Sequence, residues 1–209
     1  MNKSKKNPVN LLSRECMVTA LMQLLKDKPL SAISVSELTQ KAGVSRMTYY
    51  RNYKSKEEIL ISYLDDLVYL YREDVKKHPI SENYYDMRSL VRCFTYFAKY
   101  KDFLDSLFQS GLGYHFLEAV CGYVMEKWQK PEDGIEHFYE LQAFSGAILT
   151  IYLSWASSGS RETPRELATI LHNIYCPDKE NNRKTQKNLS AKEGNDKLIL
   201  NNGNMEEKV

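Results

Sequence analysis

Apolar residues recur along most of the chain at intervals of three and four, which is the spacing of one buried face of an α-helix. The pattern is clearest near the N-terminus, at Met17, Ala20, Leu21, Leu24 and Leu25. The alternation typical of a half-buried strand is weak throughout. The pattern therefore predicts an all-α protein. Its first helix is expected at about residues 10–28, because the residue before Pro29 disfavours the helical conformation.

Helix starts are marked by a serine or threonine followed three residues later by glutamate. These pairs are Ser34 with Glu37, Ser55 with Glu58, and Thr163 with Glu166. In each pair the hydroxyl can accept the backbone N–H three residues on, while the glutamate carboxylate accepts the N–H of the capping residue itself. Ser45 marks a further start without a glutamate. Pro164 occupies a first helical position, where its missing N–H costs nothing.

The whole pattern predicts about nine helices followed by a tail. After the first helix, the others are expected at about residues 35–42, 46–52, 56–77, 84–99, 101–109, 113–130, 135–157 and 164–175. Pro79 is expected to close the fourth. From Pro177 onward the chain is rich in Asn, Lys and Glu and poor in aromatic residues, so residues 177–209 are predicted to be disordered.

The stretch "ISVSELTQKAGVSRMTYYRNYKSKEEIL", residues 33–60, places Gly43 between two short helices. A turn of three to four residues that contains glycine, between two helices, is typical of a helix-turn-helix. Gly43 can adopt a positive φ and so end the first of these helices at little cost. Leu38, Ala42 and Val44 supply apolar groups that would pack the two helices together.

At about 100° per residue, the helix 46–52 divides into two faces. Two tyrosines fall together and are predicted to face the core, Tyr49 and Tyr53. The remaining face presents two arginines, a thioether, a hydroxyl and a phenol, on Arg46, Met47, Thr48, Tyr50 and Arg51. Arginine can bind guanine with two hydrogen bonds, and Thr and Met can contact thymine methyl groups. This face therefore predicts a helix that reads bases in the major groove of DNA.

Basic residues near the helix starts suit the phosphate backbone. Lys54 and Lys56 lie at the start of helix 56–77, where unpaired N–H groups and the helix dipole favour an anion, and Ser34 offers a similar terminus. Residues 1–60 contain 11 Lys/Arg against 5 Asp/Glu, a net charge of +6, whereas residues 61–209 contain 18 against 22, a net charge of −4. A basic head on a mildly acidic body fits nucleic-acid binding at one end, although an unevenly charged solvated surface explains the charge equally well.

Residues 11–64 resemble the DNA-binding domain of the TetR family of transcriptional regulators. The match includes the turn glycine, the serine cap, the Thr-Tyr-Tyr run and the Lys-Ser-Lys-Glu start of the fourth helix. The resemblance implies DNA-contacting positions at Ser34, Ser45, Arg46, Thr48, Tyr50, Arg51 and Lys56. Met47 and Lys54 complete the DNA-binding set that we expect. The resemblance also implies a three-helix helix-turn-helix domain at residues 9–56 and a helical effector-binding and dimerisation domain at residues 57–176.

The segment "SWASSGSRETPRELA", residues 154–168, is similar to the junction between the last two long helices of that family. There, the two helices form a four-helix bundle between two subunits. Small groups on one face of helix 135–157 would let another helix approach closely. The expected interface is Ala143, Ala147, Thr150, Tyr152, Ser154, Trp155, Leu167 and Leu171. Burial of these residues within a single chain is the alternative.

Residues 89–128 are rich in phenylalanine and tyrosine, and could line a pocket for a small apolar or aromatic effector. The candidate lining residues are Phe94, Phe97, Phe108, Tyr114, His115, Phe116 and Tyr123. The alternative is an aromatic core at helical spacing.

The sequence thus predicts a homodimeric TetR-like regulator, a repressor that binds a palindromic operator as a dimer and is released by a small effector. The alternative is a protein of the same fold that acts through a protein partner. We expect no enzyme, metal or cofactor, because no phosphate-binding loop, nucleophile elbow or metal-ligand spacing is present. The four dispersed cysteines, and the lack of an apolar run long enough for a membrane span or of a signal peptide, predict a cytoplasmic protein. The resemblance implies that it is a bacterial one.

Overall fold

The computed structural model describes residues 8–78, 81 and 83–176 of the 209-residue chain. Within these ranges every regular element is a helix, which confirms the all-α prediction. The expected helix stop at Pro79 and the expected disordered tail, residues 177–209, lie outside the described residues. Among the described helices, none combines the length and the apolar character that a bilayer span requires.

The helices follow one another along the chain with short connections. They are α1 Pro8–Leu25, the short 3-10 turn η1 Leu30–Ala32, α2 Val35–Ala42, α3 Arg46–Asn52, α4 Lys56–Val75, α5 Met87–Lys99, α6 Lys101–Gln109, α7 Gly113–Trp128, α8 Ile135–Ser157 and α9 Pro164–Tyr175. Of the nine α-helices in the described ranges, five have the predicted bounds, and the other four differ by at most three residues at an end. The η1 turn was not expected from the pattern.

The predicted serine and threonine caps form, but the glutamates behave differently from one cap to another. At α9 the box is complete, since the Glu166 N–H donates to Thr163 Oγ1 at 3.3 Å and the Thr163 N–H donates to the Glu166 carboxylate at 2.7 Å. At α2 the Glu37 N–H donates to Ser34 Oγ at 3.1 Å, yet the Glu37 carboxylate pairs with Lys28 Nζ at 2.7 Å instead of returning to the cap. That hydrogen bond from Lys28 lowers the pKa of Glu37.

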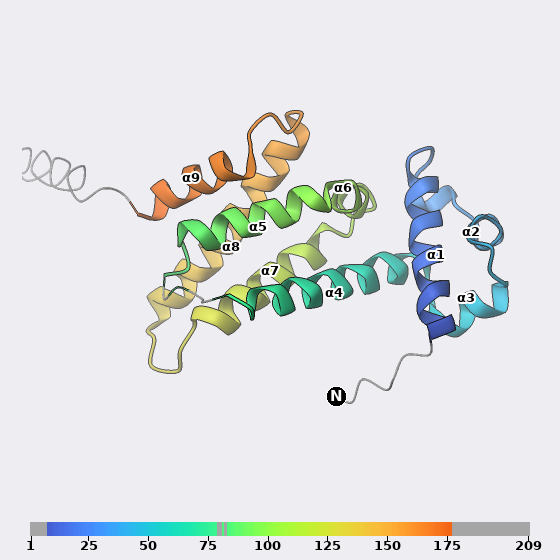
Figure 1. The fold of residues 1–209 in the computed structure, drawn as a ribbon, viewed down its shortest axis with the longest axis horizontal. Helices are drawn as coiled ribbons and strands as arrows, with labels where there is room; N and C mark the ends of the chain where they lie inside the picture. The colour runs from blue at the N-terminus through green and yellow to red at the C-terminus, as the bar shows by residue number, and fades with distance from the viewer. Residues whose placement is uncertain (1–7, 79–80, 82, 177–209) are drawn as a thin grey trace, which may run out of the picture.

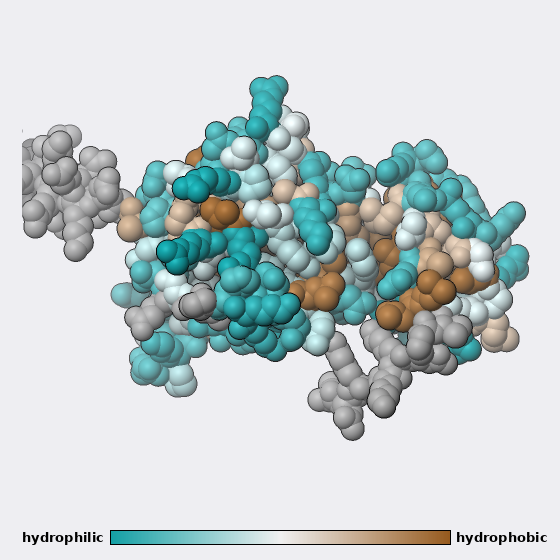
Figure 2. Space-filling view, viewed as in Figure 1, coloured by the Kyte–Doolittle hydropathy of each residue, from teal (hydrophilic) through white to brown (hydrophobic). Residues whose placement is uncertain are grey.

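The chain forms a small head and a larger body joined by one long helix (Figure 1). In the head, α1 packs against α2 and against the start of α4, while α2 packs on α3. From the head, α4 runs into the body and lies beside α7. In the body, α5 packs along α9 and α7 packs along α8. The surface in the same view is mainly hydrophilic, with apolar residues gathered near the start of α1, where Leu11 and Leu12 are exposed (Figure 2).

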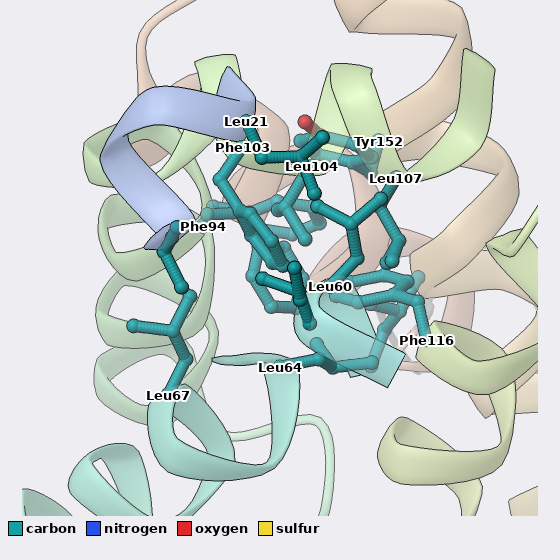
Figure 3. Close-up of a cluster of buried hydrophobic side chains, with 14 of the residues drawn as sticks. Leu21, Leu60, Leu64, Leu67, Phe94, Phe103, Leu104, Leu107, Phe116 and Tyr152 are labelled. Carbon is teal, nitrogen blue, oxygen red and sulfur yellow. The ribbon is translucent and has the colours of Figure 1, made fainter. Parts of the chain in front are cut away.

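Head and body share one continuous apolar core. Figure 3 shows the junction, where Leu21 of α1 lies with Phe103 and Leu104 of α6, near Leu60 of α4. Tyr152 of α8 reaches the same cluster and is fully buried. Because close-packed interiors transmit displacement, movement of α4 or α6 in the body must also disturb the packing of α1 in the head.

Candidate nucleic-acid interface, paired-helix faces and cavity

The turn between α2 and α3 has the geometry that the sequence predicts. Gly43 has φ 67° and ψ 28°, the left-handed conformation that closes a helix cheaply when the residue is glycine. Its N–H donates to Gln40 O at 3.2 Å, and the next N–H, of Val44, donates to Thr39 O at 3.0 Å. No heavy atom lies within 4 Å of a Cβ built on Gly43, so φ and not crowding selects glycine here.

The inner side of α3 is fixed by its two predicted core tyrosines. Tyr49 is 1% exposed and Tyr53 is 3% exposed, which confirms their place in the core. Burial raises the pKa of Tyr49, with smaller contributions from the neighbouring Tyr50 phenol and nearby carboxylates. Tyr53 is held by Arg14 of α1, whose Nε donates to the Tyr53 hydroxyl at 3.1 Å. These contacts lock α3 onto the rest of the head.

The outer side of α3 is bare. Met47 is 77% exposed and Tyr50 is 62% exposed, so both large side chains extend away from the rest of the head. Arg46 and Arg51 are also exposed, and within the described part of the chain neither takes part in an ion pair. Their donors and charges are therefore available to a partner.

The start of α3 orders the two small polar side chains on this face. Ser45 Oγ accepts the Thr48 N–H at 3.0 Å and lies 2.9 Å from Thr48 Oγ1. Thr48 is half-buried and Ser45 is exposed. Both hydroxyls thus have a partner within the head, and each keeps further hydrogen-bonding capacity, because a hydroxyl has one donor and two acceptor sites.

The two lysines near α4 are placed differently from one another. Lys54 is exposed, and its backbone N–H donates to the Glu58 carboxylate at 2.6 Å, so the expected return bond from Glu58 to its own capping residue Ser55 does not form. Lys56 turns back to the start of α2, where its Nζ donates to the carbonyls of Leu30 at 2.6 Å and Ile33 at 2.5 Å. Residue 56 is the first residue of α4, as predicted, but its ammonium lies beside the start of α2 and the exposed cap Ser34.

A second candidate surface is the outward face of α8. Ala143, Thr150 and Ser154 are exposed as predicted, and Ala147 is half-buried. Sequence reasoning missed the larger apolar residues beside them. These are Tyr139, 62% exposed, and Leu153, 37% exposed, on α8, together with Ile170 and Ile174 on α9, which are 48% and 60% exposed. Residues 170 and 174 lie one turn apart and so share a face of α9.

Four residues of the predicted dimer interface belong instead to the chain's own core. Tyr152 and Leu171 are 0% exposed, Leu167 is 4% exposed and Trp155 is 6% exposed. Trp155 Nε1 donates to Glu162 O at 2.8 Å, which ties the end of α8 to the loop before α9. Side chains so fully covered by their own chain have no area left for a partner, so the prediction was wrong for these four, and the alternative of burial within one chain holds.

The body contains an apolar cavity of about 90 Å³ between α4, α5, α7 and α8. Three of the predicted effector residues line it, Phe97, Phe116 and Tyr123. Four do not: Phe94 is 1% exposed and packs in the core, Tyr114 is 70% exposed on the surface, and Phe108 and His115 also lie outside the lining. The lining that sequence reasoning missed includes Tyr71 of α4, because α4 was read only as a connecting helix.

The polar groups of the cavity are few. The Tyr96 hydroxyl donates to Leu67 O at 2.8 Å. Burial raises the pKa of Cys93 to about 12, opposed by a hydrogen bond with Tyr71. Burial likewise raises the pKa of the Tyr71 phenol. At neutral pH the cavity is thus uncharged apart from Arg92, which stands in its lining.

Comparison with known families matches both parts of the chain. A family model described as "Bacterial regulatory proteins, tetR family" matches residues 18–63, and one described as "Transcriptional regulator C-terminal region" matches residues 87–175. The HTH-type transcriptional regulator EthR of Mycobacterium tuberculosis is 39% identical over 71 residues, which is 34% of this chain. The matched stretch spans 32% of the length of EthR, about a third.

Solved structures resemble the whole described fold. The Lin0861 protein of Listeria innocua matches with a TM-score of 0.68 and 14% identity, over 83% of this chain and 94% of that one. The fatty acid degradation regulator FadR of Bacillus halodurans matches with a TM-score of 0.59 and 17% identity, over 84% of this chain and 98% of that one. At these identities the similarity establishes the fold.

Proposed function

The chain belongs to the TetR family of bacterial DNA-binding transcriptional regulators, and we propose that it is a repressor that binds a palindromic operator as a homodimer. The observation that carries the proposal is the bare outer face of α3. The seven-residue helix α3 is anchored in the head by the buried Tyr49, while Met47 and Tyr50 on its outer side are exposed. Its outer side is therefore free to contact DNA. In the major groove, Arg46 and Arg51 would bind guanine edges, and Met47 would contact thymine methyl groups.

Phosphate contacts would set the register of the head on the duplex. Tyr50 offers a hydroxyl with no hydrogen bond inside the described part of the chain, and Lys54 offers an exposed ammonium. Ser34 caps α2 beside the Lys56 ammonium, and the first N–H groups of this eight-residue helix would also donate to a phosphate placed at its start. On this proposal the DNA-binding domain covers residues 9–56, and operator binding takes place in the cytoplasm.

Dimerisation would use the outward faces of α8 and α9. Small groups at Ala143 and Thr150 allow close approach of a second helix, and Leu153, Ile170 and Ile174 supply the apolar area. A two-fold pair places two α3 helices about 34 Å apart, so that both read successive major grooves and the operator becomes a palindrome.

Effector release would act through α4, which lines the cavity and also packs on α1. Because α4 joins the body to the head, its tilt sets the spacing of the two heads in a dimer. A small apolar ligand that fits the cavity better at one tilt of α4 therefore favours one spacing. A few kcal/mol of differential binding is enough to shift operator occupancy strongly. Residues 57–176 then form the effector-binding and dimerisation domain.

The test is selection of bound sequences from a random pool of double-stranded DNA. A palindrome with half-sites about one helical turn apart is expected. Binding should weaken steeply with salt, with a log–log slope near 0.9 per neutralised phosphate. The double variant Arg46→Ala/Arg51→Ala should lose the selected motif, while Arg161→Ala, which removes an exposed arginine of the body, should keep it. A pool that returns no enriched sequence would refute operator binding and would favour action through a protein partner.

A further inference from the structure

A basic groove of about 800 Å³ lies along the outer side of α5, beside the cavity. Its charged lining is Arg88, Arg92 and Lys99 of α5, Arg165 at the start of α9, and one acid, Asp74 of α4. Among the residues that the structure describes, none of the four basic groups takes part in an ion pair. The groove therefore has a net positive charge, although residues 61–209 together are net negative. An anionic ligand can neutralise this local positive charge.

The groove and the cavity meet. Arg92 and Tyr96 line both of them, so these two side chains stand at the boundary. The Lys99 ammonium lies 5.0 Å from the ring centre of Tyr100, and that ring also lines the cavity. Burial raises the pKa of Tyr123, which also lines the cavity, to about 12, and the positive charges of Arg72 and Arg92 oppose that rise.

We propose that the effector is an anionic amphiphile, with a short alkyl segment in the cavity and a carboxylate or phosphate headgroup on the basic groove. The proposal rests on the proposed function, because it names the ligand of the same regulatory site. Arg92 binds the headgroup at the mouth, and Arg88, Lys99 and Arg165 supply the surrounding positive field. Arginine suits this role because its planar donors bind both carboxylate and phosphate with two hydrogen bonds.

The size of the cavity limits the apolar segment. A dry cavity of about 150 Å³ holds benzene. At about 90 Å³ this cavity is smaller, so an unbranched chain of a few carbons fits it better than a ring does. A neutral molecule of the same length would gain only the apolar contacts, and a cationic one would be repelled at the groove. Charge is therefore the property by which the site selects its ligand.

The experiment compares four probes of similar length: butyl phosphate, pentanoate, pentan-1-ol and butyltrimethylammonium. Binding is followed by calorimetry and by tryptophan fluorescence, because Trp128, one of the two tryptophans, lines the cavity. Both anions are expected to bind at least about ten-fold more tightly than pentan-1-ol, and the cation should not bind. Tighter binding of butyl phosphate than of pentanoate would point to a phosphate headgroup, and the reverse to a carboxylate.

Two variants and one control assign the effect to the groove. Arg92→Met should weaken anion binding about ten-fold and leave pentan-1-ol unchanged. Arg165 lines the groove but not the cavity, so Arg165→Gln should weaken the binding of the two anions and leave the binding of pentan-1-ol unchanged. This variant decides the case if Arg92→Met also disturbs the cavity. Lys130→Gln removes an exposed charge outside both sites and should change nothing.

Equal affinity for the anions and pentan-1-ol would overturn the proposal. So would anion binding that survives both Arg92→Met and Arg165→Gln, or a failure of all four probes to bind at millimolar concentration. None of these results touches operator binding, which is measured separately on the selected DNA. A chain that holds its operator but ignores anions would keep the proposed function and lose this inference.

Discussion

The substitution Tyr53→Phe separates what holds the head together from what touches DNA. It removes one hydroxyl and keeps the ring, so the apolar packing of this 3% exposed side chain is unchanged. The lost group accepts a hydrogen bond from Arg14 Nε at 3.1 Å, and the Arg14 guanidinium lies 5.8 Å from the Tyr53 ring centre. Arg14 also contacts Ser62 and Asp66 of α4, so it clamps α1, the end of α3 and α4.

The magnitude follows from the charge and the burial of this bond. A hydrogen bond with a charged partner contributes about 1.5–3 kcal/mol to stability. Because Arg14 keeps its contacts with Ser62 and Asp66, we expect the low end, about 1.5 kcal/mol. For a protein of 150–250 residues that loss lowers the unfolding midpoint by about 3–6 °C. In an Arg14→Met background the same change should cost less than about 0.5 kcal/mol, since the partner is already gone.

The matched control is Tyr50→Phe, three positions earlier and within α3, which ends just before Tyr53. The Tyr50 hydroxyl makes no hydrogen bond within the described residues and its side chain is 62% exposed, so stability should change by less than about 0.5 kcal/mol. Operator affinity should instead fall about five- to ten-fold, and similarly for all DNA sequences, because a phosphate contact carries no base preference. Tyr53→Phe should leave operator affinity nearly unchanged at temperatures where the head is folded.

The assays are urea and thermal unfolding followed by circular dichroism, and DNA binding by fluorescence anisotropy. They are applied to the wild type and to the four variants Tyr53→Phe, Tyr50→Phe, Arg14→Met and Arg14→Met/Tyr53→Phe. The reasoning is refuted if Tyr50→Phe destabilises the fold as much as Tyr53→Phe does. It is also refuted if Tyr53→Phe costs as much in the Arg14→Met background as in the wild type, because the two groups would then not be coupled.

Three further outcomes are expected. Arg51→Ala should change which bases are enriched in a binding selection; a uniform loss over all sequences would mean that α3 does not read bases. Leu153→Glu should convert the proposed dimer to monomers in analytical ultracentrifugation, with the far-ultraviolet circular dichroism spectrum unchanged. A dimer that persists would place the interface elsewhere. Cys93 is half-buried and the burial of its thiol raises its pKa to about 12, so at pH 8 only about one molecule in ten thousand carries the thiolate. Iodoacetamide should therefore label the exposed Cys176 first, and equal labelling by peptide mass spectrometry would contradict the raised pKa.

Local signals explain why the helix bounds and the α3 faces could be predicted. A capping hydroxyl such as Ser45, a left-handed glycine such as Gly43, and a 3.6-residue period each act within a few residues along the chain. The faces of α3 follow from the same period, which is why Tyr49 was placed in the core and Met47 outside it. Side chains whose partners lie far along the sequence escaped this reasoning, as Lys56 shows by bonding to Ile33.

The sequence alone determined the all-α fold, the helix-turn-helix and the family, because these depend on periodicity, capping and a motif in register. Only the tertiary structure decided which apolar residues are covered by their own chain. Helix α8 is apolar on nearly every side, so its pattern cannot say that Tyr152 and Trp155 turn inward while Leu153 turns outward. The same holds for the cavity, where Tyr71 and Arg92 meet only once α4 and α5 are packed together. The burial of a side chain depends on the helices that pack against it, and the local sequence of one helix does not specify which helices these are.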